Sequence, residues 1–79
     1  MWVRSQNKKI LMEIRQVEIS KYNNIIIGFN SHFETLGTYS TKEKALKVLD
    51  MIQEHITNMY IGTSNYMGKP FQMPADEEV

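Results

Sequence analysis

The chain contains no cysteine, which excludes disulfide bonds and thiolate metal sites. Long apolar stretches are also missing: no uninterrupted run exceeds three residues, as at 25–27, whereas a membrane-spanning helix needs about 20. Residues 1–9 place charges where the apolar segment of a secretion signal would lie. We therefore expect a cytoplasmic protein without transmembrane helices.

Motifs that carry catalysis or bind cofactors are absent as well. The four glycines are isolated and never form a phosphate-binding G-x-x-x-x-G-K pattern, and no G-x-S-x-G nucleophile elbow occurs. His32, in a predicted turn, and His55, in a predicted helix, lack cysteines or clustered carboxylates at metal-ligand spacing. The position of His55 near the helix end suits an imidazole beside the helix macrodipole. We predict no enzymatic activity, no metal and no cofactor.

Net charge is zero, with nine basic and nine acidic residues. Nucleic-acid binding is therefore the less expected function, because affinity for phosphate backbones comes largely from lysine and arginine. The charges are nevertheless uneven: residues 1–47 carry eight basic and four acidic side chains, and residues 48–79 carry one basic and five acidic. This leaves open a cationic patch on the first half or solvated charges without a common role.

The first half of the chain alternates with the period of β-strands. Apolar residues fall on one side of 10–14 and then of 17–19, but the parity changes at Arg15 and Gln16, which predicts a bulge or corner there. Gly28 within a strand indicates a bulge or a close backbone approach. The predicted strands are separated by polar turns and cover 2–4, 10–14, 17–19, 25–29 and 33–40.

The stretch 37–52 predicts a capped helix. Ser40 and Glu43 have the spacing of a capping box, and Gly62 is a plausible left-handed stop. Because the chain offers one strongly amphipathic helix and one sheet face to bury, we expect the helix to cover the sheet rather than to read a partner. The apolar stripe follows helical spacing and comprises Ala45, Val48, Leu49, Ile52, Ile56, Met59 and Tyr60.

The predicted fold class is therefore α+β: an antiparallel meander sheet of four or five strands with one long helix across one face. With 79 residues the chain has room for one core, which we assign to a domain at 1–62. Residues 63–79 form a tail with a frayed end. Phe71–Met73 either add an edge strand or contact another subunit, and homo-oligomerisation is expected for so small a chain.

The start of the chain holds the strongest candidate binding residues. Trp2 is the only tryptophan and begins a strand beside Arg4, with Gln6, Lys8 and Lys9 across the turn. An indole beside a guanidinium and an amide suits a flat anionic ligand or a protein hot spot. The alternative is that Trp2 plugs the core or a sheet edge with Arg4 over it.

These residues also carry a resemblance. "MWVRSQNKK" at 1–9 and "LGTYSTKEKALKVLDMI" at 36–52 resemble a group of small uncharacterised proteins of Gram-positive bacteria, their phages and mobile elements. Those proteins open with M-W-[IV]-R-S-Q. The resemblance implies an accessory protein of the counter-defence or host-takeover type, including one that sequesters a nucleotide signal.

The order of strands followed by "GTYSTKEKA" is also similar to the arm-binding domain of tyrosine recombinases. That resemblance implies a sheet presented to DNA. The strands at 25–30 and 33–40 contain no lysine or arginine and one acid, Glu34, unlike the basic reading strands of such domains. We therefore expect a module that binds a small anionic ligand or a host protein, with sheet-mediated DNA binding as the alternative.

Overall fold

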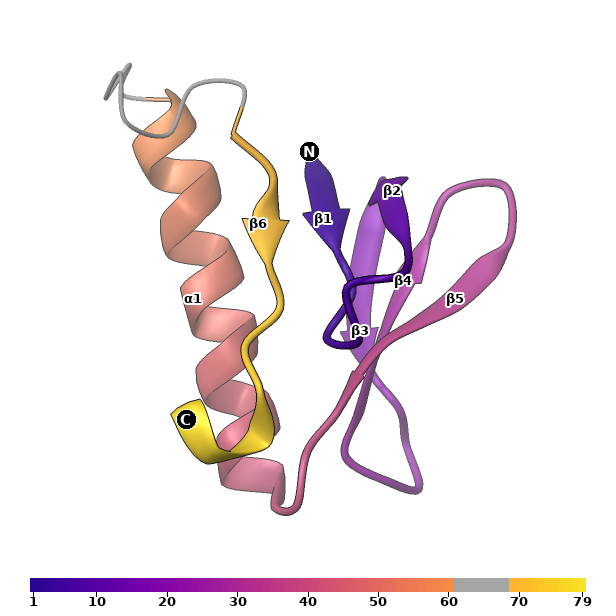
Figure 1. Cartoon of the computed structure of the whole chain (residues 1–79), viewed down its shortest axis with the longest axis vertical. Helices are drawn as coiled ribbons and strands as arrows, with labels where there is room; N and C mark the ends of the chain where they lie inside the picture. Colours follow the sequence, from indigo (N-terminus) through magenta and orange to yellow (C-terminus); the bar gives the residue numbers. More distant parts are fainter. Residues whose placement is uncertain (61–68) are drawn as a thin grey trace.

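The computed structural model of the chain describes residues 1–60 and 69–79 (Figure 1). The predicted helix stop at Gly62, the apolar residues Tyr66 and Met67, and the boundary between 62 and 63 lie outside the described residues. The elements are β1 (Trp2–Arg4), β2 (Leu11–Glu13), β3 (Gln16–Ile19), β4 (Ile25–Phe29), β5 (Phe33–Thr38), α1 (Lys42–Tyr60), β6 (Phe71–Gln72) and a 3-10 turn, η1 (Asp76–Glu78).

The described strands form two three-stranded sheets. One is antiparallel with the order β3-β4-β5, and the other has the order β2-β1-β6. The α+β class, with one helix over an antiparallel sheet, is confirmed; the strands are divided between two sheets instead of forming one meander. The change of parity at Arg15 and Gln16 is the reason, because the chain turns there from β2 of one sheet into β3 of the other.

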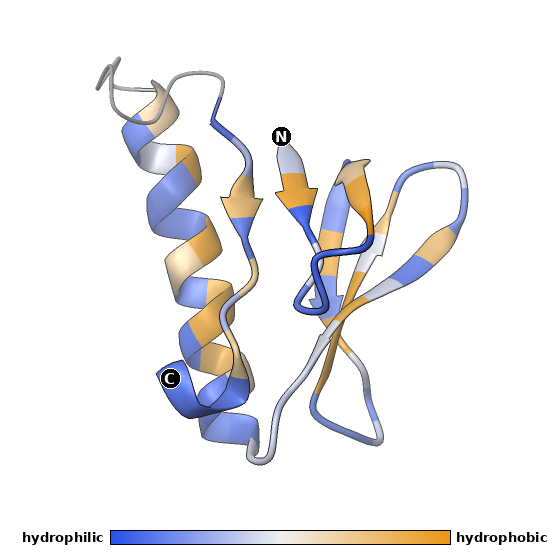
Figure 2. Ribbon diagram, viewed as in Figure 1, coloured by the Kyte–Doolittle hydropathy of each residue, from blue (hydrophilic) through white to orange (hydrophobic). Residues whose placement is uncertain are grey.

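The first part of the apolar stripe of α1 is buried, as its spacing predicts, whereas Leu49, Ile56 and Met59 are partly buried. Ala45 and Val48 are fully buried and Ile52 is 1% exposed. The apolar residues of α1 gather on the side that faces the strands (Figure 2). The helix therefore covers the sheet with this part of its apolar stripe.

The C-terminal segment belongs to this core. β6 pairs in parallel with β1, with Val3 opposite Phe71, and lies between β1 and α1 (Figure 1). Phe71 and Met73 are buried with Val3 in one cluster. Of the two alternatives left open for Phe71–Met73, the structure has the edge strand. The chain end is not frayed as expected, since Asp76–Glu78 form η1.

Gly28 has close neighbours, but they are side chains and not the backbone that was predicted. A Cβ atom at this position would lie 2.7 Å from Cδ1 of Leu36 and 3.0 Å from Cγ2 of Ile14. The irregular register lies nearby, between Ile26 and Ile27 in the pairing of β4 with β5. Only glycine lets the β2–β3 corner and β5 pack this closely against β4.

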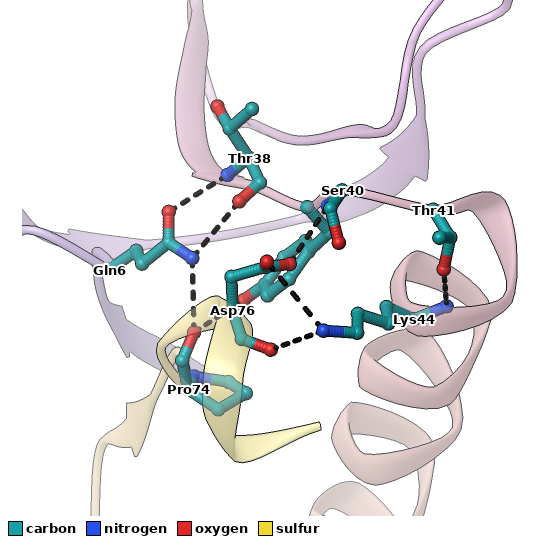
Figure 3. Close-up of polar contacts among 8 residues, drawn as sticks. Gln6, Thr38, Ser40, Thr41, Lys44, Pro74 and Asp76 are labelled. Carbon is teal, nitrogen blue, oxygen red and sulfur yellow. Dashed lines mark hydrogen bonds and ion pairs between the residues drawn. The ribbon is translucent and has the colours of Figure 1, made fainter.

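The start of α1 differs from the predicted capping box. The Lys44 amide donates to Oγ1 of Thr41, so Thr41 caps the helix in place of Ser40. The Ser40 amide donates instead to the Asp76 carboxylate at 2.8 Å (Figure 3). A carboxylate 36 residues along the chain thus takes the role that the sequence assigned to Glu43.

Asp76 fastens the C-terminal segment to the start of α1. Its carboxylate lies 3.6 Å from Nζ of Lys44, which also donates to the Asp76 carbonyl (Figure 3). The Ser40 amide, followed by the Lys44 ammonium, lowers the pKa of Asp76. Beside it, burial raises the pKa of Tyr39 to about 12, so this phenol stays protonated and donates to the Pro74 carbonyl.

The lowered pKa of Asp76 predicts a loss of stability in acid. A carboxyl with a lowered pKa in the folded state contributes stability that is present above about pH 4 and is lost as the pH falls through the folded pKa. Asp76→Asn keeps an oxygen for the Ser40 amide but cannot titrate. Urea unfolding from neutral pH into this acid range should show a smaller pH dependence for Asp76→Asn than for wild type; equal dependence would contradict the assignment.

Candidate functional site

Trp2 and Arg4 project from the same side of β1. Both are exposed, whereas Val3 between them is fully buried, as alternation along a strand requires. Trp2 is 47% exposed and is not part of the buried core cluster. Across the hairpin, Trp2 pairs with Glu13 and Arg4 pairs with Leu11, which is 56% exposed.

Trp2 and Leu11 lie over a surface groove of about 380 Å³, which we call the Trp2 groove. One wall is β2 and the other is the end of the β4–β5 hairpin, and the Asn30 side-chain amide joins them by donating to the Glu13 carbonyl at 2.9 Å. The lining residues are Trp2, Ile10, Leu11, Met12, Glu13, Asn30, Ser31, His32 and Glu34. Four of these residues are apolar and five are polar or charged, including two carboxylates.

The basic residues predicted for the site do not line the Trp2 groove. Nε of Arg4 donates to the Lys8 carbonyl at 3.0 Å, which holds the guanidinium against the turn between β1 and β2. Lys8 adopts a left-handed conformation in this turn, with φ of 66°, and Lys8 and Lys9 are exposed. None of these three lines the Trp2 groove, although Arg4 shares the outward side of β1 with Trp2.

Gln6 is bound into the scaffold. Its Nε2 donates to the carbonyls of Thr38 and Pro74, at 3.1 and 3.2 Å, and its Oε1 accepts from the Thr38 amide at 2.9 Å (Figure 3). The backbone amide of Gln6 donates to the Leu36 carbonyl at 2.7 Å. Gln6 thus closes the edge of β5 as a neighbouring strand would, and it ties β5 to the C-terminal segment.

One histidine, His55, is buried in the fold, and the other, His32, lines the Trp2 groove. His55 is 7% exposed and donates from Nε2 to the Lys69 carbonyl at 3.0 Å, while its ring meets Phe71 edge-on. It therefore joins α1 to the segment before β6, a role that its position near the helix end did not predict. His32 lines the Trp2 groove. Within the described ranges no three His, Cys, Asp or Glu side chains gather as metal ligands do.

Sequence reasoning missed the acidic and hairpin residues of the groove. Glu13 lies in the predicted strand at 10–14, and pairing this strand with 2–4 places Glu13 opposite Trp2. That pairing was the available signal. Glu34 and Asn30 come from another sheet, so no local pattern connects them to Trp2.

No family model matches the chain, and no curated protein or solved structure is similar to it at a significant level. In residues 1–60 and 69–79 there is also no helix of the length and hydrophobicity needed to cross a membrane.

Proposed function

We propose that the chain is a non-enzymatic binding module that holds a partner protein through the Trp2 groove. The observation that carries the proposal is the exposure of Trp2 and Leu11 side by side over a groove with two carboxylates. Large apolar side chains that are exposed together mark interaction sites, and tryptophan is enriched among the residues that dominate binding energy. The resemblance to phage and mobile-element proteins supports a host protein as the partner, in a counter-defence or host-takeover role.

A small anionic or nucleotide ligand is supported less well. Of the cations predicted for such a ligand, Arg4 ends β1 and donates to the turn, and Lys8 and Lys9 lie in that turn. None of them lines the groove, whereas Trp2 has Glu13 and Glu34 as neighbours there. Carboxylates repel an anion that stacks on the indole. The electrostatics of the groove therefore favour an apolar and basic surface of a protein over a phosphate group.

Trp2→Ala should abolish most of the partner binding while the fold is kept, because half of the indole is already exposed. Truncating a hot-spot tryptophan costs about 2 kcal/mol or more, a loss of about thirtyfold or more in affinity. The matched control is Tyr22→Ala, which removes an aromatic ring that is 86% exposed on the β3–β4 loop. Affinity enrichment from a host lysate should recover the same protein with wild type and Tyr22→Ala but not with Trp2→Ala; equal recovery by all three would refute the proposal.

Sheet-mediated DNA binding, the alternative, finds little support. The outward side of the β3–β5 sheet bears Glu18 and exposed Phe33 and Thr35, and in the strands described it carries no lysine or arginine. Fluorescence anisotropy with a labelled DNA duplex should therefore show no binding at low salt. Binding that weakens steeply with added salt would favour the DNA function instead.

A further inference from the structure

The outer edge of β2 has unpaired backbone groups. The Ser5 amide donates to the Ile10 carbonyl and the Ile14 amide donates to the Met1 carbonyl. In an antiparallel ladder, paired and unpaired positions alternate, so Leu11 and Glu13 turn their amides and carbonyls away from β1. Within the described part of the chain, the Leu11 amide, the Leu11 carbonyl and the Glu13 amide have no hydrogen-bond partner on that side.

Asn30 shows what this edge accepts. Its side-chain amide donates to the Glu13 carbonyl, which is the bond that a backbone amide of a further strand would make. The remaining backbone groups of this edge open toward the Trp2 groove, since Leu11, Met12 and Glu13 line it. The β5 edge differs, because Gln6 already satisfies Leu36 and Thr38 there. An uncovered strand edge is a template for pairing with another chain.

The lining of the groove defines the side chains of the incoming strand. Successive side chains of an extended segment point to opposite faces, so every second residue of the segment would lie on the face that carries Trp2, Leu11 and Glu13. Exposed Trp2 and Leu11 offer an apolar contact, and Glu13 and Glu34 offer charge complementarity to lysine or arginine. A peptide with acidic residues would instead place like charges together.

We propose that the partner binds by strand addition: an extended segment that carries apolar and basic residues pairs with the outer edge of β2 in the Trp2 groove. This inference rests on the proposed function, because it uses the same groove, and it names how the partner is held. Main-chain hydrogen bonds to Leu11 and Glu13 provide affinity, and the side chains of the groove provide the preference for sequence.

The test uses a short capped peptide that alternates lysine and valine, and the same peptide with glutamate in place of lysine. Isothermal titration should show binding of the lysine peptide and at least about tenfold weaker binding of the glutamate peptide. Hydrogen exchange should slow at the amides of Leu11 and Glu13 in the complex. No binding of the lysine peptide at millimolar concentration, or no change at these amides, would overturn strand addition.

A matched pair of variants isolates the backbone contribution. Leu11→Ala and Leu11→Pro both remove the leucine side chain, but only proline removes the amide, and proline is tolerated where an edge amide faces outward. Leu11→Pro should bind the lysine peptide about tenfold more weakly than Leu11→Ala. Methylating alternate backbone nitrogens of the peptide should weaken its binding to wild type by a similar factor, which serves as the test if Leu11→Pro does not fold.

The outcomes separate this inference from the proposed function. If the methylated and unmethylated peptides bind wild type equally, strand addition is wrong. If Trp2→Ala still fails to recover the host protein in that case, the groove remains a binding site that acts through side chains alone. If Trp2→Ala recovers the host protein as wild type does while the amides of Leu11 and Glu13 are protected by the peptide, the strand edge is real and the proposed hot spot is wrong.

Discussion

Ile52→Ala should lower the free energy of unfolding by about 2–5 kcal/mol. Ile52 is 1% exposed at the centre of the α1 stripe, where the helix lies against the strands, so its truncation leaves a cavity in the only core cluster found in the described residues. A chain of this length has a stability of roughly 0.05–0.15 kcal/mol per residue, so this loss would consume a large part of it.

The adjacent Met51 provides the control, because it is in the same helix but 39% exposed. Met51→Ala should change the unfolding free energy by about 0.5 kcal/mol or less, since surface substitutions rarely do more. Urea unfolding followed by far-ultraviolet circular dichroism measures both variants. Equal losses of unfolding free energy for the two variants would mean that the apolar stripe does not face the core and that α1 does not cover the sheet in this way.

Local patterns predicted the elements with their own periodicity or turn chemistry. The helical spacing of Ala45, Val48 and Ile52 indicated the buried side of α1, and all three are buried. Strand alternation and the parity change also located the corner between β2 and β3. In each case the signal lies within one or two turns of chain, where a side chain's neighbours follow from its position in the sequence.

Contacts between distant segments account for most of what the sequence did not reveal. The Asp76 carboxylate accepts a hydrogen bond from the Ser40 amide, 36 residues away in the sequence. Gln6 donates to the carbonyls of Thr38 and Pro74, which are 32 and 68 residues away. No periodicity relates such positions. The third strand of the sheet β2-β1-β6 has the same origin, because β6 joins β1 from the other end of the chain.

For this reason, the sequence could predict only the part of the candidate site that lies within one hairpin. Trp2 and Glu13 face each other in a local hairpin whose pairing follows from its strands and turn. Glu34 and Asn30 come from the β4–β5 hairpin of the other sheet. Glu34 adds a second carboxylate to that of Glu13, so the groove is acidic although the sequence around Trp2 is basic. The choice between an anionic ligand and a protein partner therefore depends on tertiary structure.

Substitutions of Gln6 test whether this side chain supports the fold or contacts a partner. Gln6→Ala removes three side-chain hydrogen bonds, two to Thr38 and one to Pro74, and leaves the backbone bond to Leu36. Each bond contributes about 0.5–1.5 kcal/mol, so we expect a loss of about 2–3 kcal/mol in the free energy of unfolding. Gln6→Met, which keeps the length of the side chain but none of its hydrogen bonds, should lose nearly as much.

Lys9→Ala is the matched control, because Lys9 is an exposed residue of the same turn. It should unfold at the same urea concentration as wild type. Below the transition, Gln6→Ala should still bind the partner of the Trp2 groove with wild-type affinity, since Gln6 does not line that groove. Because its side chain links β5 to Pro74, Gln6 should affect stability if it belongs to the scaffold. A Gln6→Ala variant that kept its stability but lost binding would instead show that Gln6 contacts the partner.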